Sequence, residues 1–261
     1  MRIFIIRHGE SLATLDPSLF SRVEPSTVPL SQWGYEQSLE AGKAVADYYR
    51  KHSIAAPKLT LYYSPFTRIA QSKDGFMEGI KPSHIAHQIE THKEPALVER
   101  NHGEFNGLGP EAQRAKDPET YRFLYEGTSE QKFKTKMPKG ESLEDVQKRL
   151  ALFIERVTST ASQDQDIVII THGANVRCLE DILHSHQTPY GASWLVESTP
   201  PETGDVILID RDRERPLTNT RSEVLHQGKK RPAHLPENHK TSAYSPSSGC
   251  GGDMATPGGR W

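Results

Sequence analysis

Residues 2–11 of the chain, RIFIIRHGES, place a run of β-branched and aromatic side chains directly before an Arg-His-Gly sequence. Residues 167–173, IVIITHG, repeat this arrangement far along the chain. Short apolar runs of this kind are typical of strands buried on both faces of a parallel sheet. His8 and His172 are therefore predicted at points where strands leave the sheet. Because open α/β sheets bind ligands at that edge, we expect the two imidazoles to meet in one crevice.

Strands and helices are predicted to alternate along most of the chain. This alternation favours an α/β domain of stacked layers with a largely parallel sheet. Residues 90–140 are irregular, charged and rich in Gly and Pro, and a connection of that length is typically functional or mobile. Beyond the two runs quoted above, strands are predicted at 59–63, 84–89, 193–197 and 205–210, and helices at 32–51, 66–79, 118–127, from 141 to at least 157, and 175–184.

Composition limits the choice of partners and location. The 261 residues carry a formal charge of −2, which gives no ground for a nucleic-acid or membrane partner. No apolar run approaches the roughly 18 residues of a membrane span, and the one at residues 3–6 is too short for a signal peptide. The two cysteines, Cys178 and Cys250, are not expected to pair, which fits a cytoplasmic protein.

The end of the chain loses all periodicity. From about residue 213 onward we predict a disordered tail, because Ser, Pro and Gly come to dominate and few apolar residues remain. The tail contains a short basic run, residues 229–231 (KKR). We interpret this run as solvated, with a targeting or binding patch as the alternative.

His8 is the candidate nucleophile. Arg7 before it offers a fork of donors suited to phosphate, and Gly9 after it allows close approach to the backbone. A neutral imidazole can attack an electrophile and form a covalent intermediate. The alternative for a single histidine is a purely structural role in the core.

Arg68 and His172 complete a predicted basic pocket. Arg68 lies three residues after Pro65, in the first turn of a predicted helix that follows a strand, so its head can point back toward His8. Two imidazoles and two guanidinium groups suit a phosphoryl group, whose transfer depends on positioning and charge stabilisation. The alternatives are a surface ion pair for Arg68 and a metal site at the histidines. A metal is disfavoured because arginines would repel it and no carboxylate or cysteine stands at ligand spacing.

Glu99 is the candidate proton donor for a leaving alkoxide. It lies in Leu97-Val98-Glu99-Arg100, at the start of the irregular segment. Burial among apolar neighbours would raise its pKa toward the range of a general acid. The alternative is a carboxylate on a surface loop.

These motifs together resemble the histidine phosphatase superfamily, the family of the cofactor-dependent phosphoglycerate mutases and the phosphatase domain of fructose-2,6-bisphosphatase. The resemblance covers roughly residues 1–210. It rests on RHGES at 7–11, SPxxR at 64–68, LxERxxG at 97–103 and HG at 172–173, with PLSxxGxxQ at 29–37 and PxGESxxD at 138–145.

The resemblance implies a fold, a mechanism and a set of residues. The fold is a three-layer α/β/α sandwich with a mostly parallel sheet, forming one domain over residues 1–212 with a cap at about 90–140 and a tail at 213–261. His8 would carry the phosphoryl group as phosphohistidine, and Glu99 would protonate the leaving group and then activate water. No metal or other cofactor is required. The residues implied to hold the phosphoryl group or the substrate are Arg7, Ser11, Thr14, Arg68, Arg100, His172 and Gly173.

Departures from the family pattern bear on activity. Relatives carry a Trp-Asn pair where this chain has Ala13-Thr14, and the usual Phe-x-Gly-Trp run is absent at residues 19–23. Both departures argue against a glycolytic mutase. Arg177, one helical turn past the pocket, either helps to bind substrate or caps a neighbouring loop.

The sequence favours a phosphomonoesterase that acts on a small phosphorylated molecule or a phosphopeptide. The alternatives are mutase-type phosphoryl transfer and a catalytically idle phosphate-binding or scaffold protein.

Overall fold

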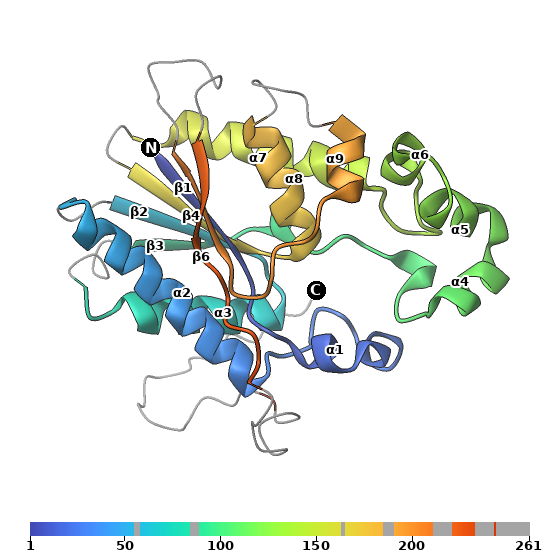
Figure 1. The fold of residues 1–261 in the computed structure, drawn as a ribbon, viewed down its shortest axis with the longest axis horizontal. Coiled ribbons are helices and arrows are strands. Elements are labelled where there is room, and N and C mark those ends of the chain that lie inside the picture. The colour runs from blue at the N-terminus through green and yellow to red at the C-terminus, as the bar shows by residue number, and fades with distance from the viewer. Residues whose placement is uncertain are drawn as a thin grey trace, which may run out of the picture.

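A mixed β-sheet forms the centre of the molecule (Figure 1). The computed structural model describes residues 1–54, 58–83, 89–162, 165–184, 191–210, 221–232 and 243. Within them the sheet has six strands in the order β3-β2-β4-β1-β5-β6. The first four in this order run parallel, and β5 and β6 are antiparallel to their neighbours. The bounds are β1 (Arg2–Arg7), β2 (Lys58–Tyr63), β3 (Ile89–Lys93), β4 (Gln165–Thr171), β5 (Val206–Asp210) and β6 (Arg221–His226).

Helices cover both faces of this sheet, which confirms the predicted three layers (Figure 1). Alternate residues of a strand point to opposite faces, so each strand serves two cores. Ile3 and Ile5 pack with the helices of one layer, and Phe4 and Ile6 with those of the other. The first layer holds α7 (Leu143–Thr160), α8 (Gly173–His184) and α9 (Gly191–Glu197), and the second holds α2 (Gln32–Lys51) and α3 (Thr67–Ile80).

Serine caps define the starts of two helices. Ser31 accepts a hydrogen bond from the backbone N–H of Gly34 at the start of α2. Ser142 and Asp145 form a reciprocal capping box at the start of α7. Each cap satisfies backbone donors that the first helical turn leaves free. Both helices begin close to the predicted positions.

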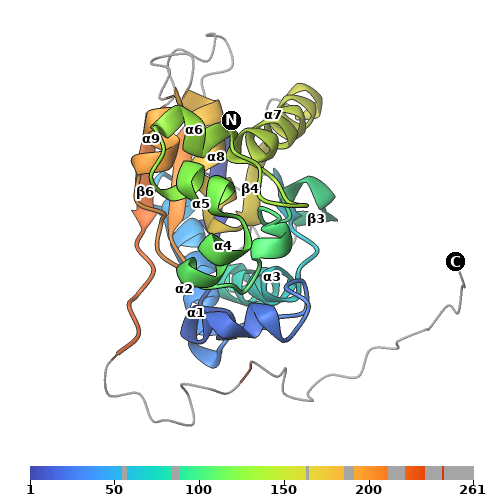
Figure 2. The same cartoon turned by 90° about the vertical axis from the view of Figure 1, so that its right-hand side faces the viewer.

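The segment predicted as a cap is largely helical. It contains α4 (Pro110–Lys116), α5 (Pro118–Tyr125) and α6 (Ser129–Lys134), of which only α5 was predicted. These helices form a lobe to one side of the sheet (Figure 1), and from that side they stand in front of it (Figure 2). Two short 3-10 helices, η3 (Pro95–Leu97) and η4 (Gly103–Phe105), lead into this lobe. Two other short elements, α1 (Leu12–Leu15) and η1 (Pro17–Ser21), follow β1.

One predicted strand is wrong, and another lies mostly outside the described residues. Residues 193–197 were expected to form a strand, but they belong to helix α9. In that segment Leu195 is buried and Trp194 half-buried, and the helix packs on α6 and α8, so tertiary contacts override the strand propensity of Trp194 and Val196. The strand expected at 84–89 lies mostly outside the described residues, and β3 begins at Ile89.

The predicted disordered tail also needs correction. Residues 221–226 form β6, which pairs with β5 at the edge of the sheet, and residues 227–232 follow it. An edge strand needs little apolar surface, because its backbone hydrogen bonds come from the neighbouring strand; Leu225 packs on the core and Val224 is exposed. Cys250 lies outside the described residues. No helix in the described ranges is long and apolar enough to cross a membrane.

Candidate active site

The two histidines meet at the carboxyl ends of β1 and β4, as the sequence predicts. These strands are parallel neighbours, with Arg7 in register with Thr171. The backbone N–H of His8 donates to the carbonyl of Thr171 at 3.0 Å. The rings of His8 and His172 lie edge to face with centroids 5.3 Å apart. Both side chains are buried.

His8 is held as a neutral imidazole with a defined tautomer. Its Nδ1 lies 2.6 Å from the carbonyl oxygen of Gly9. A carbonyl can only accept, so Nδ1 carries the hydrogen and the lone pair is on Nε2. Burial, with the positive charges of Arg68 and Arg7, holds the pKa of His8 well below its ordinary value. The ring is thus neutral at physiological pH.

Arg68 lies in the first turn of α3 and reaches the same edge. Its Nη2 donates to Nδ1 of His172 at 3.2 Å, and its Nη1 donates to the carbonyl of Pro25 at 2.7 Å. Its guanidinium group also lies over the ring of Phe66, 5.0 Å from the centroid. Burial lowers the pKa of Arg68 to about 10; Glu99 opposes this shift and the positive charge of Arg7 adds to it. Arg68 is therefore a desolvated cation whose charge a bound anion would balance.

His172 is also neutral, and both of its ring nitrogens are engaged. Because Arg68 can only donate, Nδ1 of His172 accepts, and Nε2 donates to Ser64 Oγ at 3.1 Å. Burial and the charge of Arg68 hold the pKa of His172 well below its ordinary value.

Arg7 supplies a second buried cation beside His8. Its Nη1 donates to the carbonyl of Pro201. Burial lowers its pKa, although Glu99 and Glu202 oppose the shift. Its Nε is buried and has no hydrogen-bond partner among the described residues. Gly173 packs against this group, since a Cβ there would lie 3.3 Å from Nε.

Glu99 lies at the edge of this cluster. Its Oε2 is 3.6 Å from Nδ1 of His172, too far for a hydrogen bond, and its Oε1 accepts from the backbone N–H of Arg100 at 2.9 Å. The side chain is 27% exposed, so the carboxyl group is open to solvent and to a ligand.

Two side chains from helices α7 and α8 hold the turn that carries Glu99. Arg149 donates to the carbonyls of Ala96 and Val98 at 2.6 and 2.8 Å. Asn175 donates to the carbonyls of Leu97 and Val98, each at 2.9 Å. The turn is therefore fixed against the core although it contains no regular element at Glu99 itself.

The loop after β1 passes very close to the start of α2. A Cβ on Gly9 would lie 1.9 Å from the carbonyl oxygen of Gly34, so only glycine allows this crossing. The N–H of Gly9 donates to Ser72 Oγ of α3 at 3.2 Å. This packing sets the direction in which His8 leaves the strand.

Other predicted substrate-binding residues have mainly structural contacts in this structure. Ser11 and Thr14 form a capping box at the start of α1, and the Thr14 side chain is exposed. Arg100 donates to the carbonyl of Glu141 at 3.1 Å. Arg177 donates to the carbonyls of Leu195 and Ser198, so it caps the end of α9, one of its two predicted roles.

Sequence reasoning missed the residues that orient the site from behind. Ser64 is hydrogen-bonded to His172, and Ser72 to the N–H of Gly9 in the loop after His8. Arg149 and Asn175 hold the turn that carries Glu99. Ser64 could have been found from its place in the SPxxR motif. The other three lie on helices whose pattern reveals only which face is apolar.

Among the residues the structure describes, no group of three or more His, Cys, Asp or Glu side chains is placed to hold a metal ion.

Comparison with known proteins places the chain in a family. The family model for the histidine phosphatase superfamily, branch 1, matches residues 3–219. The chain therefore belongs to that superfamily, as its motifs suggest.

The proteins that are similar to this chain are named for different activities. The chain is 27% identical over 183 residues to a 2,3-bisphosphoglycerate-dependent phosphoglycerate mutase of Rhizobium rhizogenes, covering 69% of this chain and 78% of that protein. Its structure is similar to that of alpha-ribazole phosphatase from Shigella flexneri, with a TM-score of 0.64, 19% identity and coverage of 88% and 100%. It is also similar to phosphoglycerate mutase from Bacillus anthracis, with a TM-score of 0.62, 16% identity and coverage of 86% and 92%. These two structural likenesses concern the fold.

Proposed function

We propose that this protein is a phosphomonoesterase that works through a phosphohistidine on His8 and needs no metal ion. The observation that carries the proposal is a neutral His8 whose Nδ1 is bonded to Gly9, so that the lone pair stands on Nε2. This nucleophile lies beside two desolvated arginines, Arg7 and Arg68. An attacking lone pair next to buried cations suits the transfer of an anionic phosphoryl group.

In the first step, Nε2 of His8 attacks phosphorus as the bond to the leaving oxygen breaks. Arg7 and Arg68 would bind the equatorial oxygens, where the charge of the transition state lies. Both are held by backbone carbonyls, so little rearrangement is needed when the substrate binds. A bound dianion would also favour protonation of His172 at Nδ1, and this N–H could then donate to a phosphoryl oxygen in place of accepting from Arg68.

Glu99 would handle the protons of both steps. Its carboxyl group gives a proton to the leaving oxygen, and its carboxylate then takes a proton from the water that attacks phosphohistidine. The products are an alcohol, inorganic phosphate and free His8. The solvent-facing position of Glu99 at the edge of the cluster suits both water and leaving group.

Support from relatives is divided between hydrolysis and transfer. Relatives named as mutases favour transfer between phosphoglycerates, and the similar fold of alpha-ribazole phosphatase accommodates hydrolysis. We favour hydrolysis because Thr14 stands where mutases carry asparagine, and its hydroxyl is bonded to Ser11. The proposed substrate is a small phosphorylated molecule or a phosphopeptide.

The function is tested by incubating the purified chain with p-nitrophenyl phosphate, phosphoglycerates, sugar phosphates and phosphopeptides in the presence of EDTA. We expect net release of inorganic phosphate that EDTA does not reduce. Loss of activity to EDTA would contradict the metal-free mechanism. Bisphosphoglycerate-dependent interconversion of phosphoglycerates without net phosphate release would identify a mutase instead.

Replacing Glu99 with glutamine is expected to slow hydrolysis according to the leaving group. An alkyl phosphate needs a proton on its leaving oxygen, so kcat should fall about 10²-fold or more. For p-nitrophenyl phosphate, whose leaving group departs as an anion, the first step should be nearly unaffected, and a burst of p-nitrophenol should precede slow turnover. The measurement is a comparison of the two substrates by rapid mixing.

Glu104→Gln is the matched control, because Glu104 is a carboxylate of the same region paired with Lys116 and Lys139 at the surface. It should retain wild-type rates on both substrates. Equal losses on both substrates in Glu99→Gln, with no burst, would argue against the proton-transfer role.

A further inference from the structure

The loop that carries the candidate nucleophile also carries a buried carboxylate. Glu10 lies two residues after His8, and its side chain is only 10% exposed. Ser31 Oγ, at the start of α2, donates to its Oε1 at 2.7 Å. One hydroxyl does not balance a buried negative charge, so this carboxylate needs a cation.

That cation is Arg231, which comes from the opposite end of the chain. Its Nε lies 3.2 and 3.1 Å from the two carboxylate oxygens of Glu10, and its Nη2 donates to Oε1 as well. The Arg231 side chain is 16% exposed. A forked, largely buried pair of this kind fixes direction as well as distance. The expectation of a solvated basic run is therefore wrong at Arg231, whereas Lys229 and Lys230 are exposed.

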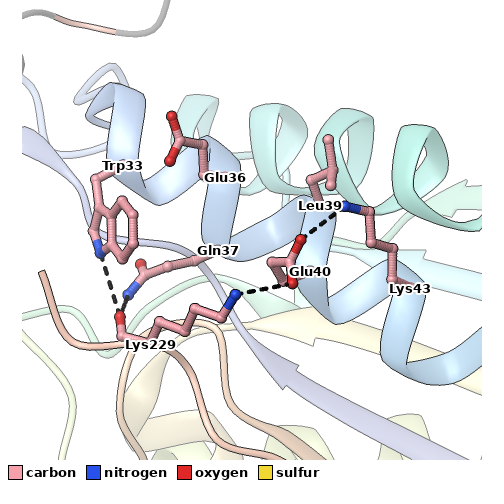
Figure 3. A pocket seen from close by; sticks show the side chains of 7 residues that line it. All are labelled: Trp33, Glu36, Gln37, Leu39, Glu40, Lys43 and Lys229. Atoms are coloured by element: carbon pink, nitrogen blue, oxygen red, sulfur yellow. Dashed lines mark hydrogen bonds and ion pairs between the residues drawn. The ribbon is translucent and has the colours of Figure 1, made fainter.

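Residues 227–232, here called the C-terminal strap, are tied to the body of the protein along their length. The N–H of Gly228 donates to Asp205 Oδ1 at 2.7 Å. A Cβ at Gly228 would lie 1.9 Å from the carbonyl of Thr203, so the strap passes too close for any other residue. The carbonyl of Lys229 accepts from Trp33 and Gln37 on α2 (Figure 3).

Gln37 connects the strap to the nucleophile loop directly. Its Nε2 donates to the Lys229 carbonyl at 2.8 Å, while its Oε1 accepts from the backbone N–H of Glu10 at 2.8 Å. The strap is therefore linked to Glu10 in two ways: directly through the Arg231 side chain, and indirectly through the Gln37 amide. The strap lies beyond residue 219, where the match to the family model ends.

We propose that Arg231 is a positioning residue for the reaction at His8: by pairing with Glu10, it fixes the loop that aims the nucleophile. The proposal rests on the proposed function, because it concerns the same reacting group. Without Arg231, the Glu10 carboxylate would be left buried with a single hydroxyl, and the loop would shift to bring it toward water. A displacement of about 1 Å at an attacking atom costs on the order of 10²-fold in rate.

The test is Arg231→Met in the full-length chain, assayed with p-nitrophenyl phosphate and with orthovanadate, which mimics the five-coordinate phosphorus of the transition state. We expect kcat to fall about 10- to 100-fold with KM changed less than about 3-fold, and vanadate affinity to fall about 10-fold. Arg231→Lys, which keeps the charge but not the fork, should recover part of the loss. Lys230→Met is the control and should match the wild type.

Glu10→Gln separates positioning from loss of fold. The double variant Glu10→Gln/Arg231→Met leaves no buried charge unpaired, so it should fold even where the single variant does not. Its kcat should exceed that of Arg231→Met, so the loss in the double variant should be smaller than the product of the losses in the two single variants. Multiplicative losses, or a lower melting temperature with unchanged kcat and vanadate affinity, would overturn the proposal. A wild-type chain that releases no phosphate would refute the proposed function, and vanadate affinity alone would then decide the role of Arg231.

Discussion

Replacing His8 with alanine is expected to reduce phosphate release by about 10⁴-fold or more. The variant lacks the atom that forms the covalent intermediate. Without that intermediate, the other groups of the site have nothing to hydrolyse. His172 cannot substitute for it, because it is fully buried and both of its nitrogens are bonded to neighbours. The measurement is kcat/KM with p-nitrophenyl phosphate in the presence of EDTA.

Binding should survive this change even though turnover does not. Arg7 and Arg68 remain in place in His8→Ala, so the variant should still bind inorganic phosphate, measured by calorimetry. His92→Ala, at an exposed position on edge strand β3, is the control for loss of an imidazole. Retention of more than about one hundredth of wild-type activity by His8→Ala would place the nucleophile elsewhere.

Replacing Arg68 with methionine is the second change with a large expected effect. We expect kcat/KM to fall about 10³-fold, because the variant loses a preorganised charge aimed at the transferring group. Arg68→Lys should remain at least about 10-fold below wild type, because a single ammonium group cannot bind both the Pro25 carbonyl and a phosphoryl oxygen in the forked geometry. The measurement is steady-state kinetics with p-nitrophenyl phosphate.

The stability of Arg68→Met distinguishes a binding charge from a structural one. Arg68 is buried beside another cation, and its lowered pKa, about 10, reflects that desolvation. Removing a desolvated charge offsets the lost hydrogen bonds to Pro25 and His172, so the free energy of unfolding should change by less than about 1 kcal/mol. Phosphate should raise the melting temperature of the wild type and not that of the variant. A large loss of stability with a small loss of activity would show that Arg68 is structural.

The sheet and the proximity of the two histidines could be predicted from sequence, because strands buried on both faces have a recognisable run of apolar residues. Strands β1 and β4 read as uninterrupted apolar runs, and each run ends at a His-Gly pair. Arg68 could be placed because its distance from Pro65 sets its position in a helix. The starts of α2 and α7 could be predicted to within two residues, since capping chemistry is local.

The remaining features depend on contacts between distant segments. Residues 193–197 include Trp194 and Val196, which favour a strand, and packing on neighbouring helices makes them part of α9. The polar sequence of β6 carries too little apolar surface to indicate a strand, since the edge of β5 supplies its hydrogen bonds. Arg231 and Glu10 are 221 positions apart, and no local pattern links them.

The central claim is a covalent bond between Nε2 of His8 and phosphorus, and the most direct measurement is to trap it. The protein is mixed briefly with p-nitrophenyl phosphate, quenched in alkali, which preserves phosphohistidine, and analysed by peptide mass spectrometry. We expect one phosphoryl group on the peptide that contains His8, lost on acid treatment and absent from the His8→Ala variant. Phosphorylation of another residue, or hydrolysis with no phosphoryl group at His8 under any quench time, would contradict the account.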